Sequence, residues 1–261
     1  MNIALQEEVA RFTRKAAEHG FVASFDGNLS LRSSDGIYIT ATRTLKSDAS
    51  ASDICLIDLD GNLLEGERKP SSETLMHLLI YRERPDVMGV VHTHAPYATA
   101  FASARQPLDA AIFPEVILDI GPVPLAEYAT PSTEDVPNSL KSAIAWANGV
   151  LLANHGLVCM GGSLAEAFFR TEKLEHAAKT LIAAQTLGGA VPLKRCEVDY
   201  LYETHQAFKR RGVLLDCESL DHPSCRTSDD REKLVCDPND NNCREELISK
   251  TAQAVLKRLK G

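Results

Sequence analysis

The first part of the chain alternates between apolar and polar positions in a way that predicts one helix followed by short strands. Apolar residues recur every three to four positions near the start, which predicts a helix with one buried face. These residues are Leu5, Val9, Phe12 and Ala16. Three segments over 28–32, 36–40 and 54–58 then alternate or run apolar, with Asp-Gly turns at 35–36 and 60–61. We therefore expect a largely antiparallel meander after the helix.

The middle of the chain predicts a mixture of helices and strands. Helical spacing and capping residues predict helices over 73–83, 97–104, about 131–147, about 163–187 and 197–211, and apolar runs predict strands around residue 92, over 113–118 and on both sides of residue 155. On the long helix we expect Glu172, Glu175 and His176 on a solvated face or in a contact between subunits. Periodicity by itself predicts only a mixed α and β fold.

The C-terminal part differs in composition from the rest. Residues 216–243 are rich in Asp, Ser, Asn, Pro and Cys with little apolar periodicity, which predicts a flexible linker. Residues 244–260 return to helical spacing. We therefore expect a main domain over 1–215, a polar linker over 216–243 and an amphipathic helix over 244–261.

Composition and charge narrow the class of protein. With 261 residues, 44% of them hydrophobic, the chain can bury the core of one large domain. No apolar run approaches the length of a membrane span, and the first residues are unlike a secretory signal, so we expect a cytoplasmic protein with no membrane partner. A net charge of −8 argues against general nucleic-acid binding, although Arg43 and Lys46 form a local cluster that can hold a phosphate. The seven cysteines form no Cys-x-x-Cys pair, so we expect reduced thiols.

Two histidines interrupt the apolar segment 89–96. On a strand, alternate side chains share a face, so His92 and His94 would project the same way, as two ligands of one metal ion must. A pair of structural histidines in a core strand explains this short motif equally well. The pair is therefore a moderate signal by itself.

Two further segments favour the metal site. His155 lies between apolar runs and precedes a glycine, which predicts a hairpin tip that brings in a third ligand. Glu73 follows Ser71 and Ser72 at the start of the predicted helix over 73–83, where a capping serine and a first-turn acid are ordinary features. Three imidazoles with an open position nevertheless form a catalytic zinc pattern, and a nearby carboxylate can serve as a ligand or a base.

Together these motifs resemble the class II aldolase/adducin family, and within it the L-fuculose-1-phosphate aldolases. The matching pieces are Gly27-Asn28-Leu29-Ser30-Leu31-Arg32, Ile39-Thr40-Ala41-Thr42, Ser71-Ser72-Glu73, His92-Thr93-His94 and Asn154-His155-Gly156, and the resemblance covers roughly residues 5 to 212. A cupin barrel also uses His-x-His but requires a glutamate four or five residues later, which is absent here. The resemblance implies an α/β fold, namely a mostly antiparallel central sheet with helices on both faces, and a homotetramer.

The resemblance also implies a phosphate site. In the family the Asn28 loop, the loop ending at Thr42 and the pair Ser71-Ser72 hold the substrate phosphate, using neutral donors and a helix N-terminus. Without the resemblance, a turn-forming Asn28 and helix-capping serines would explain these residues. The family's usual glycine after the threonine loop is Arg43 here. This residue either adds a phosphate contact or reshapes the loop, and the sequence does not decide between the two.

The expected reaction is metal-dependent aldol chemistry on a phosphorylated sugar. One zinc ion per chain on His92, His94 and His155 would serve the reversible cleavage of L-fuculose 1-phosphate, or a related ketose 1-phosphate, to dihydroxyacetone phosphate and L-lactaldehyde. Glu73 would move the proton next to the carbonyl. Glu115 occupies the approximate place of a tyrosine proton donor of the aldolases and of a glutamate of the methylthioribulose-1-phosphate dehydratases. A metal-dependent dehydratase or epimerase is therefore the alternative, whereas a non-enzymatic adducin-like module has no need of these residues.

The last predicted helix, over 244–261, suggests where in the cell the protein is located and what it binds. Residues 244–261 carry an apolar stripe, begin with acidic residues and end with basic ones, as suits an amphipathic helix. A helix this short needs a partner for its apolar face, which can be the protein's own core or a neighbouring subunit. It also resembles the encapsulation peptides of enzymes housed in bacterial microcompartments. A microcompartment shell protein is therefore a second candidate partner, with the microcompartment interior as the alternative location.

Overall fold

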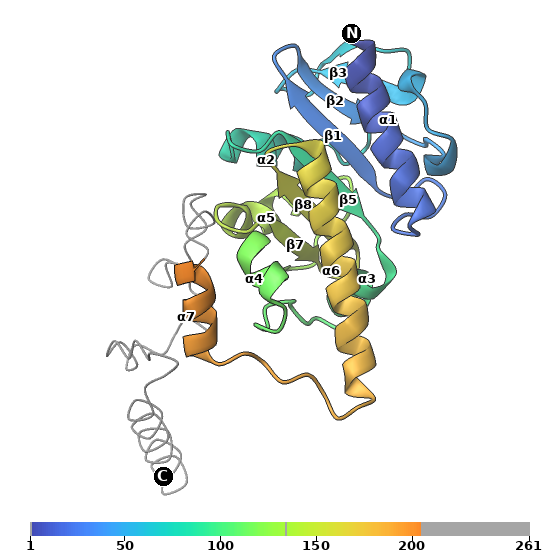
Figure 1. The fold of residues 1–261 in the computed structure, drawn as a ribbon. Helices are drawn as coiled ribbons and strands as arrows, with labels where there is room; N and C mark the ends of the chain where they lie inside the picture. Colours follow the sequence, from blue (N-terminus) through green and yellow to red (C-terminus); the bar gives the residue numbers. More distant parts are fainter. Residues whose placement is uncertain (1, 134, 205–261) are drawn as a thin grey trace, which may run out of the picture. The chain divides into compact units, whose positions relative to one another are not determined.

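The computed structural model describes residues 2–133 and 135–204 and divides the chain into two units (Figure 1). The first unit, Met1–Pro192, holds the sheet. The second, Leu193–Gly261, includes the described helix α7 (Arg195–Thr204). The predicted linker over 216–243 and helix over 244–261 lie outside the described residues. No helix in the described part of the chain has the length and apolar character that a membrane span needs.

A sheet of eight strands organises the described residues of the first unit. The strands are β1 (Asn28–Ser33), β2 (Gly36–Thr40), β3 (Ile54–Ile57), β4 (Leu63–Glu65), β5 (Gly89–Thr93), β6 (Leu125–Ala126), β7 (Gly149–Leu152) and β8 (Gly156–Gly161). Their order is β4-β3-β2-β1-β5-β8-β7-β6, and all neighbours are antiparallel except the parallel pair β6 and β7. The three strands predicted first are confirmed as β1, β2 and β3. The register aligns β1, β5 and β8 at the centre of the sheet.

Helices cover both faces of this sheet. They are α1 (Ile3–Glu18), α2 (Thr74–Glu83), α3 (Pro96–Ser103), α4 (Pro114–Asp119), α5 (Asp135–Ile144) and α6 (Leu164–Gln185). One buried apolar cluster joins the sheet to α1, α3, α4 and α6, and a second joins the opposite face to α2 and α5. Figure 1 shows α1 and α6 on the same side of the strands. The predicted fold class, a mostly antiparallel sheet between two helical layers, is confirmed.

Strand β1 shows how the two faces differ. Leu29 and Leu31 are buried in the apolar cluster beneath α1 and α6. Asn28 and Ser30, one residue out of phase, are also buried but face α2, where their side chains bond to residues of that helix region. Alternation along one strand therefore sends polar side chains toward one helical layer and apolar side chains toward the other.

Helix α6 lies close to the central strands because a glycine allows it. A Cβ atom added to Gly89 would lie 2.4 Å from the Cα of Leu164, a contact that real side chains do not make. Ser163 caps the helix, with its hydroxyl accepting a hydrogen bond from the Glu166 N–H. The long helix is thereby fixed against β5, the strand that carries the paired histidines.

The segment 113–118 corrects one prediction. The apolar run was expected to form a strand, but Pro114–Asp119 form the helix α4. Pro114 occupies the first turn, where its missing N–H costs nothing, and Glu115 follows it as a first-turn acid. Short apolar runs do not distinguish buried strands from short helices, and the proline was the better signal. The helix predicted over about 131–147 is also shorter, since α5 covers Asp135–Ile144.

Glu175 corrects a second prediction. It was expected on a solvated face or at a subunit contact, but its side chain is buried with 7% of the residue exposed. The carboxylate accepts hydrogen bonds from the backbone N–H groups of Tyr97 and Ala98 at 3.0 and 2.8 Å. These groups belong to the first turn of α3, where a helix favours negative charge. Glu175 therefore ties α6 to the helix that begins two residues after His94.

Candidate metal centre

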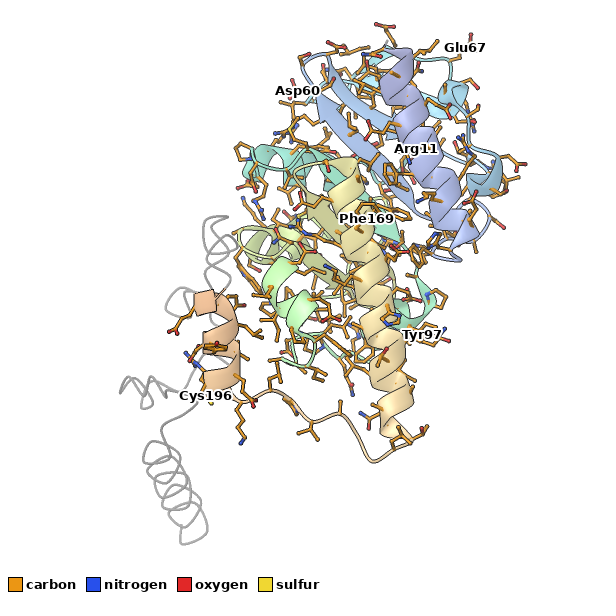
Figure 2. All side chains as sticks on the ribbon, viewed as in Figure 1. Arg11, Asp60, Glu67, Tyr97, Phe169 and Cys196 are labelled. Carbon is orange, nitrogen blue, oxygen red and sulfur yellow. The ribbon has the colours of Figure 1, made fainter. Side chains whose placement is uncertain are left out.

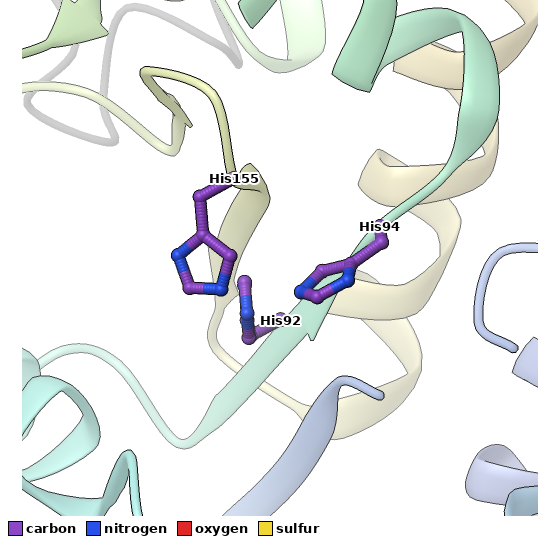
Figure 3. A group of neighbouring side chains, drawn as sticks. All are labelled: His92, His94 and His155. Atoms are coloured by element: carbon purple, nitrogen blue, oxygen red, sulfur yellow. The ribbon is translucent and has the colours of Figure 1, made fainter. Parts of the chain in front are cut away.

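Three histidine rings meet at one end of the central strands (Figure 3). His92 lies on β5, His94 follows its last residue, and His155 lies in the turn between β7 and β8. The ring centroids are 5.1 Å apart for His92 and His94, and 4.8 Å for His155 with each of the other two. One ring nitrogen from each residue lies within 4.8 Å of the others. The structure therefore brings the three predicted metal ligands together.

The turn at His155 requires the glycine that follows it. A Cβ atom added to Gly156 would lie 2.3 Å from the backbone oxygen of Thr93. Asn154 adopts a left-handed backbone conformation with φ of 56°, which asparagine tolerates better than most residues. The Asn-His-Gly motif thus lets the hairpin lie directly beside the end of β5. This close approach carries the His155 ring to the paired histidines.

The hydrogen bonds of the rings suit metal binding. His92 Nδ1 lies 3.1 Å from the Leu157 carbonyl oxygen, which can only accept, so Nδ1 carries a proton and Nε2 is the nitrogen that can bind a metal ion. The buried Nε2 atoms of His92 and His94 make no hydrogen bond of good geometry within the described residues, and His92 Nε2 has the Glu73 carboxylate beside it. Orphaned buried nitrogens that converge on one point, in a three-imidazole set, fit a divalent ion such as zinc.

The ionisation states agree with this fit. Burial, followed by the charge of His92, lowers the pKa of His94 to about 3 and that of His155 to about 4, so both rings are neutral. For His92, burial opposes the charged form, but the adjacent Glu73 carboxylate outweighs it and raises the pKa. A metal ion requires neutral imidazoles and would compete with a proton at this position.

Glu73 lies among the histidines although it begins helix α2. Its Oε2 atom is 3.2 Å from His92 Nε2, and its Oε1 atom is 3.4 Å from His155 Nε2. The amide of Asn28 donates a hydrogen bond to Oε2 at 2.8 Å. Burial raises the pKa of Glu73, but His92, His155 and Asn28 together lower it well below its usual range. The side chain is therefore a carboxylate, and it makes no capping hydrogen bond to its own helix.

A pocket of about 330 Å³ opens beside the histidines. Its walls include all the residues expected to bind phosphate, which are Asn28, Thr42, Arg43, Ser71 and Ser72, together with Glu73, His94 and His155. The hydroxyls of the serine pair lie where the chain enters α2. Neutral donors and the basic residues Arg43 and Lys46 thus line the same cavity as His94, His155 and Glu73, which is an arrangement suited to an anionic substrate.

Arg43 adopts a left-handed backbone conformation with φ of 54°. This is the conformation that glycine favours, so the loop keeps the shape that a glycine at this position would give it. Arg43 is exposed and is one of the residues that line the pocket. The sequence left open whether Arg43 adds a phosphate contact or reshapes the loop. Because the loop shape is retained, the first interpretation is favoured.

Three residues in or near this pocket were not predicted from the sequence. Asp26 Oδ2 lies 3.8 Å from His94 Nδ1, and Ser132 lines the opening. The third, His77, lies on α2 behind Asn28 and is completely buried. A four-residue interval between Glu73 and His77 on the predicted helix was the signal available in the sequence.

Two other residues predicted to belong to the site differ in position, since Lys46 lines the pocket and Glu115 does not. Lys46, on the short 3₁₀ helix Lys46–Asp48, lines the pocket, and its Nζ donates to the carbonyl oxygens of Phe25 and Thr44, each at 2.9 Å. Burial lowers its pKa to about 8, although Asp26 opposes the shift. Glu115 is exposed on α4 and is not among the described residues that line the pocket.

Comparisons with known proteins agree with this geometry. Residues 7–182 match the family described as Class II Aldolase and Adducin N-terminal domain. The chain is 32% identical to the 5-deoxy-D-ribulose 1-phosphate aldolase of Bacillus thuringiensis serovar kurstaki, over 78% of this chain and 96% of that protein, and 35% identical to the 3-oxo-tetronate 4-phosphate decarboxylase of Escherichia coli, over 68% and 86%. A solved L-fuculose 1-phosphate aldolase superposes with a TM-score of 0.73 at 32% identity, over 79% of this chain and 98% of that one. The chain therefore belongs to the class II aldolase and adducin family.

Proposed function

We propose that the protein is a zinc-dependent aldolase that reversibly cleaves L-fuculose 1-phosphate, or a related ketose 1-phosphate, to dihydroxyacetone phosphate and L-lactaldehyde. The observation that carries the proposal is the carboxylate of Glu73, 3.2 Å and 3.4 Å from two of three converging imidazoles, at the wall of a pocket that is also lined by the residues proposed to bind phosphate. Relatives named as aldolases of sugar phosphates support this class of substrate.

Three sets of side chains would have separate roles: the histidines would hold the metal ion, a second set would bind the phosphate, and Glu73 would transfer the proton. A divalent ion on His92, His94 and His155 would supply a positive charge that stabilises the negative charge developing on the substrate's carbonyl oxygen. Thr42, Arg43 and the serine pair would hold the phosphate group and so fix the position of the reacting carbons. Because the phosphate ligands and Glu73 line one cavity, a single bound substrate can meet both.

Glu73 is the proton-transfer group in this proposal. In the condensation direction its carboxylate removes a proton from the carbon next to the carbonyl of dihydroxyacetone phosphate, and the resulting electron pair forms the new bond to the aldehyde carbon. In the cleavage direction that carbon–carbon bond breaks, the pair returns to the same carbon, and the protonated Glu73 gives its proton back. The lowered pKa of Glu73 suits the condensation direction, since the free enzyme then holds the base form.

The proton on the aldehyde oxygen needs a second group, for which the sequence suggested Glu115. Glu115 is exposed on α4 and outside the described wall of the pocket, so within one chain it does not meet the substrate. Its proposed role therefore requires delivery by a neighbouring subunit of the expected homotetramer. If Glu115 instead serves a dehydration, the product from methylthioribulose 1-phosphate would be a diketone phosphate with no aldol product from lactaldehyde.

The assembly and location are parts of the same proposal. Tyr97 and Phe169 are 36% and 50% exposed on the helical layer that contains α3 and α6, and exposed aromatic residues of this kind suit a subunit contact (Figure 2). The segment 244–261 would act as an encapsulation peptide in a microcompartment. Deleting it should leave catalysis and the oligomer intact, and its fusion to a fluorescent protein should be recruited to shells. If deletion instead abolishes activity or the oligomer, and the fusion stays diffuse in cells that make shells, the segment is structural and this part of the proposal fails.

The function is tested by loading the protein with zinc and adding dihydroxyacetone phosphate and L-lactaldehyde. We expect a ketose 1-phosphate as the product. The Glu73→Gln variant should lose roughly a hundredfold or more in turnover and lose exchange of the dihydroxyacetone phosphate proton with deuterated water, while substrate still binds. The control is Glu83→Gln, an exposed glutamate on the same helix. Normal exchange in the Glu73 variant would remove Glu73 from the mechanism.

A further inference from the structure

A line of buried polar side chains runs from Glu73 into the protein between α2 and β1. Glu73, His77 and Tyr81 recur at four-residue intervals along α2 and therefore share one face of that helix. Asn28 and Ser30 are two residues apart on β1 and share the face opposite. Four residues of helix and two of strand both advance by about 6 Å, so the two sets stay in step.

Every neighbouring pair along this line is in hydrogen-bond contact. Asn28 Nδ2 lies 2.8 Å from Glu73 Oε2, and Asn28 Oδ1 lies 2.6 Å from His77 Nε2. His77 Nδ1 lies 2.6 Å from the Ser30 hydroxyl, which in turn lies 2.8 Å from the Tyr81 hydroxyl. Asn28, Ser30, His77 and Tyr81 are each no more than 3% exposed, so water does not compete for these bonds.

The chemistry of the groups fixes the direction of each bond. A carboxylate only accepts, so Asn28 presents its N–H₂ group to Glu73 and its oxygen to His77. That oxygen also only accepts, so the His77 proton lies on Nε2, and Nδ1 must accept from Ser30. The Ser30 oxygen then accepts from Tyr81. Burial, followed by the charge of His92, lowers the pKa of His77 to about 3, so the ring remains neutral.

We propose that His77 is a positioning residue, which acts through Asn28 to hold the Glu73 carboxylate between His92 and His155. The proposal rests on the proposed proton-transfer role of Glu73 but not on the identity of the aldehyde. It assigns the buried line to orientation of the base and not to proton transport, because the His77 ring keeps its single proton throughout.

Helix α2 shows what His77 prevents. Glu73 occupies the N-cap position, where a side-chain oxygen ordinarily turns back to accept from the free N–H groups of the first turn. Here it makes no such bond and points to the imidazoles. Without His77, Asn28 Oδ1 would lose its buried partner, and the amide would turn to find another. Glu73 would then be free to adopt the capping orientation, in which it is lost to catalysis.

The first test compares substitutions at His77 in the full-length, zinc-loaded protein. In His77→Leu, we expect kcat to fall roughly ten- to hundredfold, the usual scale for a residue that orients a reacting group. KM and bound metal should stay near their wild-type values, since the three histidines and the residues that would hold the phosphate, Thr42, Arg43 and the serine pair, do not change. In His77→Gln, the terminal amide can still donate to Asn28 Oδ1, and most of the activity should return.

A matched variant separates positioning from stability. Tyr81→Phe removes the far end of the line but leaves His77 bound to Asn28, so it should lower the midpoint of thermal unfolding while kcat stays close to wild type. If kcat instead follows the unfolding midpoint across His77→Leu, His77→Gln and Tyr81→Phe, the role of His77 is structural and the proposal fails. A folded His77→Leu variant with wild-type kcat would also overturn it.

The second test does not depend on activity. Nitrogen NMR of ¹⁵N-histidine-labelled protein, with the His77 signals assigned by their absence in His77→Leu, reports which ring nitrogen carries the proton. We expect a neutral ring with the proton on Nε2. A proton on Nδ1, or a charged ring near neutral pH, would overturn the proposal even if the enzyme is an aldolase. The proposed function fails separately, if wild-type protein makes no aldol product.

Discussion

The two faces of the central sheet use buried polar groups in different ways. Beneath α1 and α6, Thr13 and Thr171 are completely buried, and each hydroxyl donates to a carbonyl four residues earlier in its own helix. Beneath α2, Ser30 and His77 are equally buried but bond to each other across two elements. The hydroxyls of the two threonines are thus satisfied locally, whereas the Ser30–His77 bond fixes one element relative to another, as the buried Glu175 does between α6 and α3.

The large side chains packed on the two faces also differ, since one face buries aromatic rings and the other buries a histidine. The α6 side contains a group of aromatic rings, with Phe168 at 5.2 Å from Phe12 and 5.9 Å from Phe21 between ring centroids. On the α2 side, β5 carries His92 near its end, and this residue is completely buried. Burial of apolar area stabilises a fold without fixing single atoms, whereas hydrogen-bonded polar groups fix atoms at a cost in desolvation. We therefore expect mutations on the α6 side to change stability and mutations on the site side to change activity.

The largest effect should come from the site side. His92→Ala leaves two of the three imidazoles, and we expect bound metal to fall to near zero and activity to fall by roughly a thousandfold or more. Elemental analysis and the aldol assay measure both. His176, an exposed residue of α6, provides the control, since His176→Ala should keep its metal. Unchanged metal content in His92→Ala would show that the site is assigned wrongly.

The next effect belongs to the opposite face. Leu174 is completely buried on α6, and Leu174→Ala should destabilise the protein by about 3 kcal/mol, through lost apolar burial and the cavity left behind. Metal content and turnover per folded molecule should not change. Urea unfolding measures the stability, with Leu187→Ala as a control because Leu187 is 87% exposed. A large loss of turnover in folded Leu174→Ala would show that the two faces are not separable.

A smaller, pH-dependent effect should arise at Lys46, a buried cation on the site side. Burial lowers its pKa from 10.5 to about 8, so above pH 8 the folded protein releases a proton that the unfolded chain still binds. Wild-type stability should therefore rise relative to Lys46→Met between pH 8 and 10.5, by on the order of 2 kcal/mol. Urea unfolding of both proteins at pH 7 and near pH 9.5 checks this. A difference that does not change with pH would mean that Lys46 is not buried as a charge.

Features that depend on residues close together in the chain could be predicted from the sequence. The strands over 28–32 and 36–40 and the helix over 73–83 follow from local periodicity, and the structure confirms them as β1, β2 and α2. The histidine pair and the Asn-His-Gly turn could be placed because each motif carries its own geometry: alternation for the strand, and a close approach at Gly156 for the turn.

Features that depend on contacts between segments far apart in the chain could not be predicted from the sequence. The helix at 114–119 was predicted as a strand because four apolar residues fit both periods. Glu175 was placed on the surface because its partners, the first N–H groups of α3, lie 77 and 78 residues away in the chain. The His77 line likewise needs the register between α2 and β1, which no local pattern encodes.

The smallest expected effect sharpens the comparison at a single residue, because it should change stability and function in opposite directions. Arg43 holds a backbone φ of 54°, which is costly for a residue with a side chain, and it lines the pocket. Arg43→Gly should relieve this cost and stabilise the protein by about 1 kcal/mol, as measured by urea unfolding.

The Arg43→Gly substitution should also raise KM for the phosphorylated substrate while leaving kcat near its original value, because a contact to the phosphate contributes equally to the ground state and the transition state. Arg43→Lys keeps a positive charge but not the backbone relief, so it should retain much of the affinity without the gain in stability. If Arg43→Gly is stabilised but KM does not change, the arginine does not bind the phosphate, and the strained conformation at this position has no function in substrate binding.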